Sequence, residues 1–170
     1  MARILLVGGG CRGRRLAGEL LAGGHAVRIT TRAESGRSAI EALGAECWVG
    51  TPDRLATLRG SLDGVAIACW LLGTASGDPE ELAALYTTRL ELFLTQAIDT
   101  TVRGVVYEPA GARVPAEAAA AGAEIAARLT ERNRIPAAML GASDADEADG
   151  ESWLAEAHAA VEDLLAAAAR

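Results

Sequence analysis

The chain has 170 residues, 51% of them hydrophobic and 4% aromatic, and its formal net charge at pH 7 is −7. This length suits a single domain, residues 1–170, with a sizeable core. The negative charge argues against a large nucleic-acid interface, because such an interface needs a basic surface to displace phosphate counterions. No apolar run approaches the length of a membrane span, and no signal-peptide pattern is present. We therefore expect a cytoplasmic protein with neither a nucleic-acid nor a membrane partner.

Cysteine, histidine and lysine usage narrows the possible chemistry. Cys11, Cys47 and Cys69 are widely spaced, and the histidines are His25 and His158. These spacings match no metal-ligand pattern, so we expect reduced thiols and no metal site. All 16 basic residues are arginine, which excludes any mechanism that requires a lysine of this chain.

Strand and helix patterns alternate along the chain. Apolar runs predict strands at 3–7, 25–31, 45–49, 65–72, 104–108 and 135–140. Helical spacing of apolar residues predicts helices from the first glycines to Gly23, at 36–43, 53–60, 78–100 and 115–134, and across a last stripe from Trp153 to Leu165. The acidic stretch 143–151 is predicted to connect the last strand and helix. This alternation predicts an α/β fold of the Rossmann type, a doubly wound parallel sheet with strand order 3-2-1-4-5-6.

A glycine-rich loop, GGGCRG, follows the first predicted strand and opens the first helix. It contains Gly8, Gly10 and Gly13 in the spacing G-x-G-x-x-G, with Cys11 and Arg12 between them. In this context the first glycine permits a tight turn, the second lets a pyrophosphate approach the backbone, and the third lets helix and strand pack closely. The helix N-terminus adds free N–H groups and a positive dipole end. We predict that this loop binds a dinucleotide.

The end of the second strand bears on the choice between NAD and NADP. Proteins that bind NAD usually carry an acidic residue there, which binds the ribose 2′-hydroxyl. This chain has Thr31 and Arg32 instead, and an arginine beside a hydroxyl suits a 2′-phosphate. Arg12 is a second candidate for that phosphate. Glu34 favours NAD if the turn brings it inward, so we expect NADP as the cofactor with NAD as the alternative.

Four stretches resemble a known superfamily. They are ILLVGGGCRGRRLAGELLAGGHAVRITTR, GVAIACWLLG, RGVVYEPAG and RNRIPAAMLGAS, within about residues 1–141. They are similar to the short-chain dehydrogenase/reductase superfamily, above all its atypical and extended members, the epimerase-like and NAD(P)H-binding reductase-like proteins. The first stretch carries most of the specificity. The resemblance implies a Rossmann fold and NAD(P) binding.

The chain departs from that superfamily at the catalytic residues. The family uses a Tyr-x-x-x-Lys pair, in which the lysine lowers the tyrosine pKa. Here Tyr86 is followed four residues later by Leu90, and Tyr107 by Gly111. The family's serine is also absent, since Glu108 and the residues after it occupy its place.

Two functions remain open at this point. One is a cofactor-binding sensor or regulatory protein without turnover. The other is an NADP(H)-dependent oxidoreductase or epimerase-like enzyme with a non-standard proton donor, for which Tyr107 and Glu108 are weak candidates at the end of the fifth strand. Trp70, at the end of the fourth strand, either packs over the cofactor or fills the end of the sheet. A Rossmann-like domain that binds no nucleotide is a third, blander interpretation.

The relatives also suggest an oligomer. In extended members of the superfamily, the helices that correspond to 78–101 and 115–134 pair across a dimer axis. Leu85, Leu92 and Phe93 suit such an interface. The alternative is that these helices pack only on the sheet.

Overall fold

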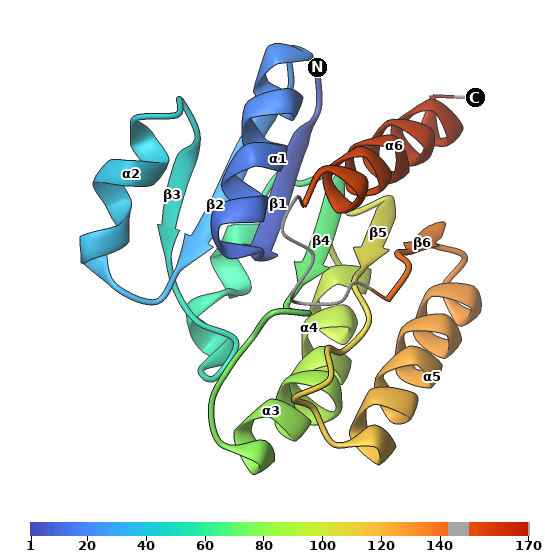
Figure 1. Ribbon diagram of the computed structural model, residues 1–170. Helices are drawn as coiled ribbons and strands as arrows, with labels where there is room; N and C mark the ends of the chain where they lie inside the picture. Colours follow the sequence, from blue (N-terminus) through green and yellow to red (C-terminus); the bar gives the residue numbers. More distant parts are fainter. Residues whose placement is uncertain (143–149, 170) are drawn as a thin grey trace.

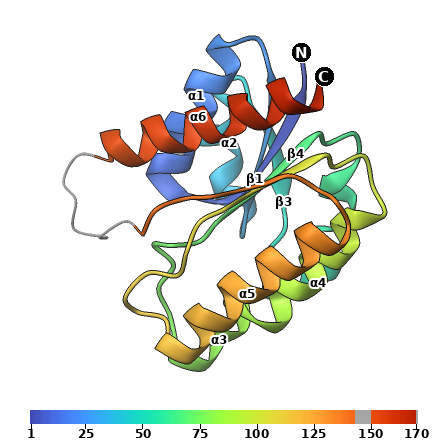
Figure 2. The same ribbon diagram turned by 90° about the vertical axis from the view of Figure 1, so that its right-hand side faces the viewer.

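A parallel sheet lies between two layers of helices in the computed structural model, which describes residues 1–142 and 150–169 (Figures 1 and 2). The predicted acidic connector lies mostly outside these ranges. The six-stranded sheet has the order β3-β2-β1-β4-β5-β6, and each neighbouring pair is parallel. This confirms the predicted α/β class and strand order. The strands are β1 (Arg3–Gly8), β2 (Ala26–Thr31), β3 (Glu46–Val49), β4 (Ile67–Leu71), β5 (Gly104–Tyr107) and β6 (Ala137–Met139).

The helices bury one apolar stripe each against the sheet. One face is covered by α1 (Gly10–Ala22), α2 (Arg37–Glu41) and α6 (Glu151–Ala168), whose apolar side chains share one core. The opposite face is covered by α3 (Pro79–Tyr86), α4 (Thr88–Ile98) and α5 (Ala116–Arg132), which share the other core. The central strands β1, β4 and β5 are buried on both faces, as their continuous apolar runs predict. Figure 2 shows the two layers from the side.

The helix predicted over 78–100 is broken in two. Asp78 caps α3 as expected, because its carboxylate accepts a hydrogen bond from the backbone N–H of Glu80. At Thr87 the backbone leaves helical geometry, with φ −121° and ψ −97°, and its hydroxyl donates to the Ala83 carbonyl. The second helix, α4, begins anew at Thr88.

The helix predicted at 53–60 is likewise replaced by two short 3-10 helices, η2 (Leu55–Thr57) and η3 (Arg59–Leu62). The Thr57 carbonyl accepts a hydrogen bond from the Trp48 indole at 2.7 Å. The Thr57 hydroxyl donates to the Arg54 carbonyl at 2.6 Å. These side-chain bonds engage carbonyls that a continuous α-helix would use.

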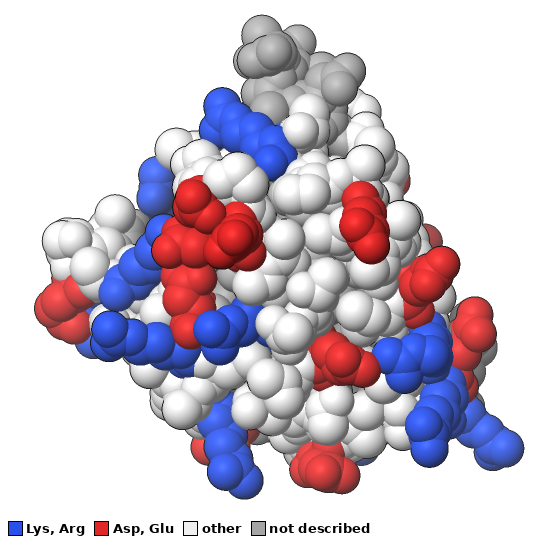
Figure 3. All heavy atoms as spheres, turned by 90° about the horizontal axis from the view of Figure 1, so that it is seen from below, with Lys and Arg blue, Asp and Glu red and all other residues white. Residues whose placement is uncertain are grey.

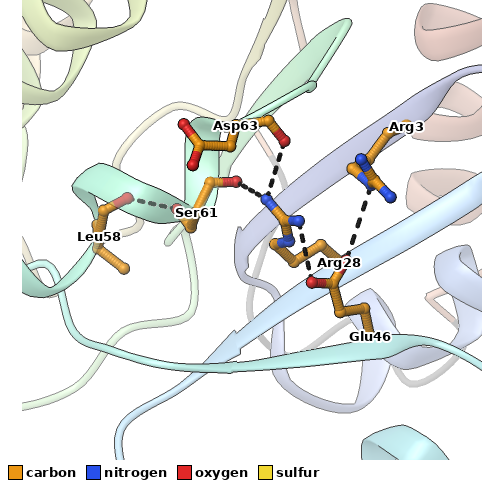
Figure 4. A network of polar contacts seen from close by, with 6 residues as sticks. All are labelled: Arg3, Arg28, Glu46, Leu58, Ser61 and Asp63. Atoms are coloured by element: carbon orange, nitrogen blue, oxygen red, sulfur yellow. Dashed lines mark hydrogen bonds and ion pairs between the residues drawn. The ribbon is translucent and has the colours of Figure 1, made fainter.

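A buried arginine network ties this segment to the sheet (Figure 4). The Arg28 side chain, on β2, is almost fully buried and donates to the Ser61 carbonyl, to the Asp63 carbonyl at 3.2 Å and to Glu46 at 2.9 Å. Arg3 lies 3.7 Å from the second Glu46 oxygen. This network has no local signature in the sequence, because the partners of Arg28 lie 18 to 35 residues away from it. Arg28 thus joins β2 and β3 to the chain that leads into β4.

Candidate functional site

The carboxyl ends of the parallel strands meet along one edge of the sheet, the lower edge in Figure 1. In open α/β sheets, ligands bind outside this edge where the strand order reverses. Here the reversal lies between β1 and β4, directly beside the glycine loop. Figure 3 views the molecule from this side, where uncharged side chains occupy the centre and arginine and acidic side chains surround it.

Three glycines of the loop are required by packing, and one of them is Gly9, where a Cβ would lie 2.8 Å from the Cα of Gly13. A Cβ at Gly8 would lie 2.6 Å from the Leu71 carbonyl oxygen, and Gly8 has a φ of +83°. A Cβ at Gly13 would lie 2.9 Å from the carbonyl oxygen of Gly8. These contacts hold β1, β4 and the first turn of α1 together, as the motif predicts for its first and third glycines.

Gly10 is different, because none of the described residues packs against its Cα. Its φ is +52°, and a Cβ added there would meet no atom of residues 1–142 and 150–169 within 4 Å, apart from its neighbours in the chain. It is also the first residue of α1, whose first turn contains no acidic side chain and whose N-cap, Gly9, provides no side-chain hydrogen bond. The first backbone N–H groups of a helix have no partner within it. Over the part of the chain that the structure describes, the loop therefore offers a positively polarised cradle that fits a pyrophosphate.

Cys11 lies in the same cradle and is exposed. Its sulfur accepts a hydrogen bond from Arg14 at 3.1 Å. The other two thiols are less accessible: Cys47 is half-buried and Cys69 is buried. Burial raises the pKa of both of these thiols above the usual cysteine value.

The end of β2 presents an arginine and a neutralised carboxylate. Thr31 donates its hydroxyl hydrogen bond to the Ala33 carbonyl at 3.2 Å, and Arg32 beside it is exposed. Glu34, the residue that would favour NAD, forms an ion pair with Arg37, which also contacts Glu41 at 3.1 Å. The hydrogen bond from Arg37 lowers the pKa of Glu34. Within the described residues, Arg32 has no hydrogen bond or ion pair of its own.

The structure directs Arg12 away from the end of β2. Its guanidinium Nη2 lies 2.7 Å from Glu108 Oε1, beyond the end of β5. It also lies over the Trp153 ring, 4.4 Å from the ring centroid. Arg12 is therefore not placed beside Arg32, with which the sequence analysis had grouped it as a candidate phosphate ligand.

Glu108 is fully buried and held by three donors. One oxygen accepts from Arg12 and from the Trp153 indole N–H at 2.8 Å, and the other accepts from the Gly73 backbone N–H at 2.8 Å. The sequence analysis missed Trp153 as a site residue, since it fits the apolar stripe of α6. A tryptophan in the first turn of a helix gives no signal of a carboxylate partner 45 residues away.

The Tyr107 hydroxyl points into the core and not toward the strand-end edge. A Cβ on Gly122 of α5 would lie 2.8 Å from this hydroxyl, and the Tyr107 ring meets Tyr86 edge-on with centroids 6.2 Å apart. Among the described residues, the hydroxyl is buried without a hydrogen-bond partner. Desolvation raises the pKa of Tyr107 to about 12.

Trp70 also lies in the core. It is fully buried and packs against Phe93 of α4, with ring centroids 4.9 Å apart. Of the two alternatives left open by the sequence, its side chain fills the end of the sheet.

Residues 1–142 and 150–169 contain neither a metal-ligand cluster nor a membrane-spanning helix. No cluster of three or more histidine, cysteine, aspartate or glutamate side chains in these ranges is placed to hold a metal ion. No helix within them has both the length and the apolar character needed to cross a membrane.

The fold matches solved structures, although no protein-family model and no curated protein matches the sequence. One match is a short-chain dehydrogenase/reductase superfamily protein from Agrobacterium tumefaciens with bound NAD (TM-score 0.66, 18% identity, 81% of this chain and 48% of that one). A second is UDP-glucose 4-epimerase from Thermotoga maritima with UDP-glucose (TM-score 0.66, 16% identity, 81% of this chain and 54% of that one). A third is triphenylmethane reductase from Citrobacter sp. complexed with NADP(H) (TM-score 0.61, 16% identity, 82% of this chain and 48% of that one).

These matches define the class of fold. The chain has the extended Rossmann fold of short-chain dehydrogenase/reductase and epimerase/dehydratase proteins, which confirms the predicted resemblance at the level of fold. It spans about half the length of the three solved proteins named above.

Proposed function

We propose that this chain binds a nicotinamide dinucleotide at the glycine loop, prefers NADP, and acts as a cofactor-binding sensor or regulatory protein in the cytoplasm. The observation that carries the proposal is the contrast between Gly8 and Gly13, where packing excludes a Cβ, and Gly10, where a Cβ would meet none of the described residues. The φ of +52° suits Gly10 by conformation, and a bare backbone at that position also leaves room for a pyrophosphate on the helix N-terminus. Structural neighbours solved with NAD and with NADP(H) support the same ligand class.

The preference for NADP rests on the end of β2. Arg32 is exposed and follows Thr31 directly, and a guanidinium fork pairs well with a phosphate. The competing carboxylate, Glu34, is already paired with Arg37. A 2′-phosphate would therefore meet an available cation rather than an unpaired anion.

The absence of turnover rests on the residues at the end of β5. The two catalytic candidates are both committed to the interior: the Tyr107 hydroxyl is buried under α5, and Glu108 is buried with three donors. The chain also contains no lysine that would lower a tyrosine pKa. These observations favour binding without chemistry over an enzyme with a non-standard proton donor.

A titration tests the binding proposal. NADPH and NADH are titrated by calorimetry into the wild-type chain, an Arg32→Ala variant and an Arg103→Ala control, whose exposed arginine precedes β5 at the opposite end of the sheet. We expect NADPH to bind more tightly than NADH, and Arg32→Ala to weaken NADPH binding by about tenfold while NADH binding is unchanged. Failure of both nucleotides to bind wild type would overturn the proposal.

A second assay separates the sensor from the enzyme. NADPH oxidation is followed by the loss of absorbance at about 340 nm in the presence of a panel of aldehydes, ketones and quinones. We expect no oxidation above the protein-free rate. Steady turnover that disappears in the Arg32→Ala variant would establish the enzyme instead.

The predicted homodimer through 78–101 and 115–134 remains part of this proposal. Leu85 and Phe93 are buried within the chain's own core, whereas Leu92 of α4 is 50% exposed. The surface left for a partner is therefore centred on Leu92. Light scattering coupled to gel filtration tests the dimer, and a monomeric mass at high concentration would remove it.

A further inference from the structure

The part of the strand-end edge formed by β4 and β5 is filled by the chain itself. The Glu108 carboxylate occupies the space beside Gly73, where even a Cβ would lie 2.6 Å from the carboxylate carbon. The loops after β4 and β5 also touch at Gly73 and Gly111, where a Cβ on Gly111 would overlap the Gly73 carbonyl oxygen. The loops after these two strands thus leave no gap between them at this level.

Two side chains from the helical layer of α1 and α6 cover Glu108. Arg12 reaches across from the glycine loop, with its side chain 18% exposed, and Trp153 reaches in from α6 and is 2% exposed. The Arg12 guanidinium stacks on the Trp153 ring while both donate to the same carboxylate oxygen. A bridge of three side chains therefore runs across the switch point, from the end of β1 to the end of β5.

A dinucleotide on this fold lies across the switch point, with one mononucleotide over each half of the sheet. The glycine motif and the end of β2 belong to the half that holds adenosine. In this chain that half has an exposed Arg32, and at Gly10 a Cβ would meet none of the described residues. The other half is closed by the Arg12–Glu108–Trp153 bridge. The two halves are therefore not equivalent for a ligand.

From this asymmetry we propose that the site recognises only the adenosine 5′-diphosphate half of its ligand, together with the 2′-phosphate, and makes no specific contact with nicotinamide. This rests on the proposed function and narrows its ligand class to adenosine nucleotides with a 5′-pyrophosphate. NADP⁺, NADPH and 2′-phospho-ADP-ribose are then equivalent ligands. A sensor of this kind reads the amount of the nucleotide and not its redox state.

The energetics of the bridge support this restriction. A nicotinamide ring that entered beside β5 would have to displace Arg12 or Trp153 and leave the buried Glu108 carboxylate without one of its three donors. Separating a buried ion pair is strongly unfavourable. The ring is thus expected to remain in water while the pyrophosphate binds the α1 amides.

The test compares ligands on the unmodified chain. Dissociation constants are measured by calorimetry for NADP⁺, NADPH, 2′-phospho-ADP-ribose and nicotinamide mononucleotide. We expect the first three to agree within about threefold and the mononucleotide not to bind. The proposal would be overturned by a dinucleotide that binds about ten times more tightly than 2′-phospho-ADP-ribose. A difference of about tenfold between the dissociation constants of NADP⁺ and NADPH would overturn it as well.

Fluorescence of the reduced ring gives an independent readout. A nicotinamide ring held in an apolar site fluoresces more strongly and at shorter wavelength than one in water, so we expect bound NADPH to keep its free emission. Enhanced, blue-shifted emission would place the ring in the protein and contradict the inference. If none of the four ligands binds, the proposed function fails as well, and that result is distinct from selective binding of the dinucleotides. Tighter binding of NADH than of NADPH would overturn the recognition of the 2′-phosphate.

Discussion

Arg12 and Glu108 join the two ends of the candidate site through a contact of 2.7 Å, although 96 residues separate them in the sequence. Arg12 belongs to the loop after β1, and Glu108 follows β5 directly. The pair engages two side chains whose positions in the sequence predict other roles, Arg12 as a phosphate ligand and Glu108 as a proton donor. It also makes the strand-end edge a point where the stability of the fold and access to the site are coupled.

The first prediction concerns the strength of this coupling. Glu108→Gln replaces a carboxylate by a neutral amide, which has one acceptor oxygen and one donor NH₂ group, among three donors. Arg12 therefore loses its counter-charge, and one N–H group loses its acceptor. We expect the free energy of unfolding to fall by about 2–4 kcal/mol. Urea denaturation followed by circular dichroism measures this change.

The matched control is Glu124→Gln, which removes the same charge from an exposed position of α5. We expect this control to lie within about 0.5 kcal/mol of wild type. If Glu108→Gln is as stable as its control, the buried network does not hold the site closed.

The second prediction is that Tyr107→Phe is folded, binds nucleotide as wild type does, and is as stable or more stable by about 1 kcal/mol. The hydroxyl is buried without a hydrogen bond among the described residues, and burying an unsatisfied polar group is unfavourable. Its removal therefore relieves the fold. Loss of more than about 1 kcal/mol, or of nucleotide binding, would indicate that the hydroxyl has a partner or a role at the site.

The pH dependence of Tyr107 gives the same substitution a second readout. The pKa rises from about 10 in the unfolded chain to about 12 in the folded one. Between these values the folded chain holds more protons, so its stability decreases as the pH rises. We expect wild type to lose about 2 kcal/mol relative to Tyr107→Phe between pH 10 and 12. Parallel pH profiles of the two proteins would contradict the burial of the hydroxyl.

The sequence predicted what local patterns encode. Continuous apolar runs and the spacing of Gly8, Gly10 and Gly13 are local, and they were sufficient for the strand order and for the position of the loop. The break at Thr87 falls within one apolar helical stripe, so helical periodicity does not register it. Pairs between residues distant in the chain, such as Arg12 with Glu108, leave no local pattern and became visible only in the structure.

The third prediction separates the structural glycines from the binding glycine. Gly10→Ala adds a methyl group that meets none of the described residues, so we expect it to cost only the strain of a left-handed residue, about 1 kcal/mol. We expect nucleotide affinity to fall by about tenfold or more, because the methyl group occupies the space of the pyrophosphate. Gly8→Ala combines the same kind of strain with a clash against the Leu71 carbonyl, and we expect it to destabilise the fold by more than about 3 kcal/mol.

Thermal unfolding and calorimetry on both variants measure the two effects. The two measurements are read together, since Gly10→Ala should be nearly as stable as wild type and yet bind nucleotide poorly. Wild-type affinity in Gly10→Ala would show that no phosphate approaches this backbone position.

The fourth prediction uses Cys11 as a reporter of the cradle. It is the exposed cysteine of the three, whereas Cys47 is half-buried and Cys69 is buried. We expect a maleimide reagent to modify Cys11 first, because Cys69 is inaccessible and burial raises the pKa of the Cys47 thiol, which lowers its thiolate fraction. Peptide mass spectrometry of the native chain, quenched at intervals, assigns the modified residue.

A nucleotide that occupies the α1 N-terminus should protect Cys11, which is the second residue of that helix. We expect the modification rate at Cys11 to fall by about fivefold or more with saturating NADPH and with saturating 2′-phospho-ADP-ribose. Both ligands would place their pyrophosphate on the backbone amides at the N-terminus of α1. Cys47 serves as the internal control, and its rate should not change. Protection of both cysteines would indicate a general tightening of the fold, and protection of neither would place the ligand away from the glycine loop.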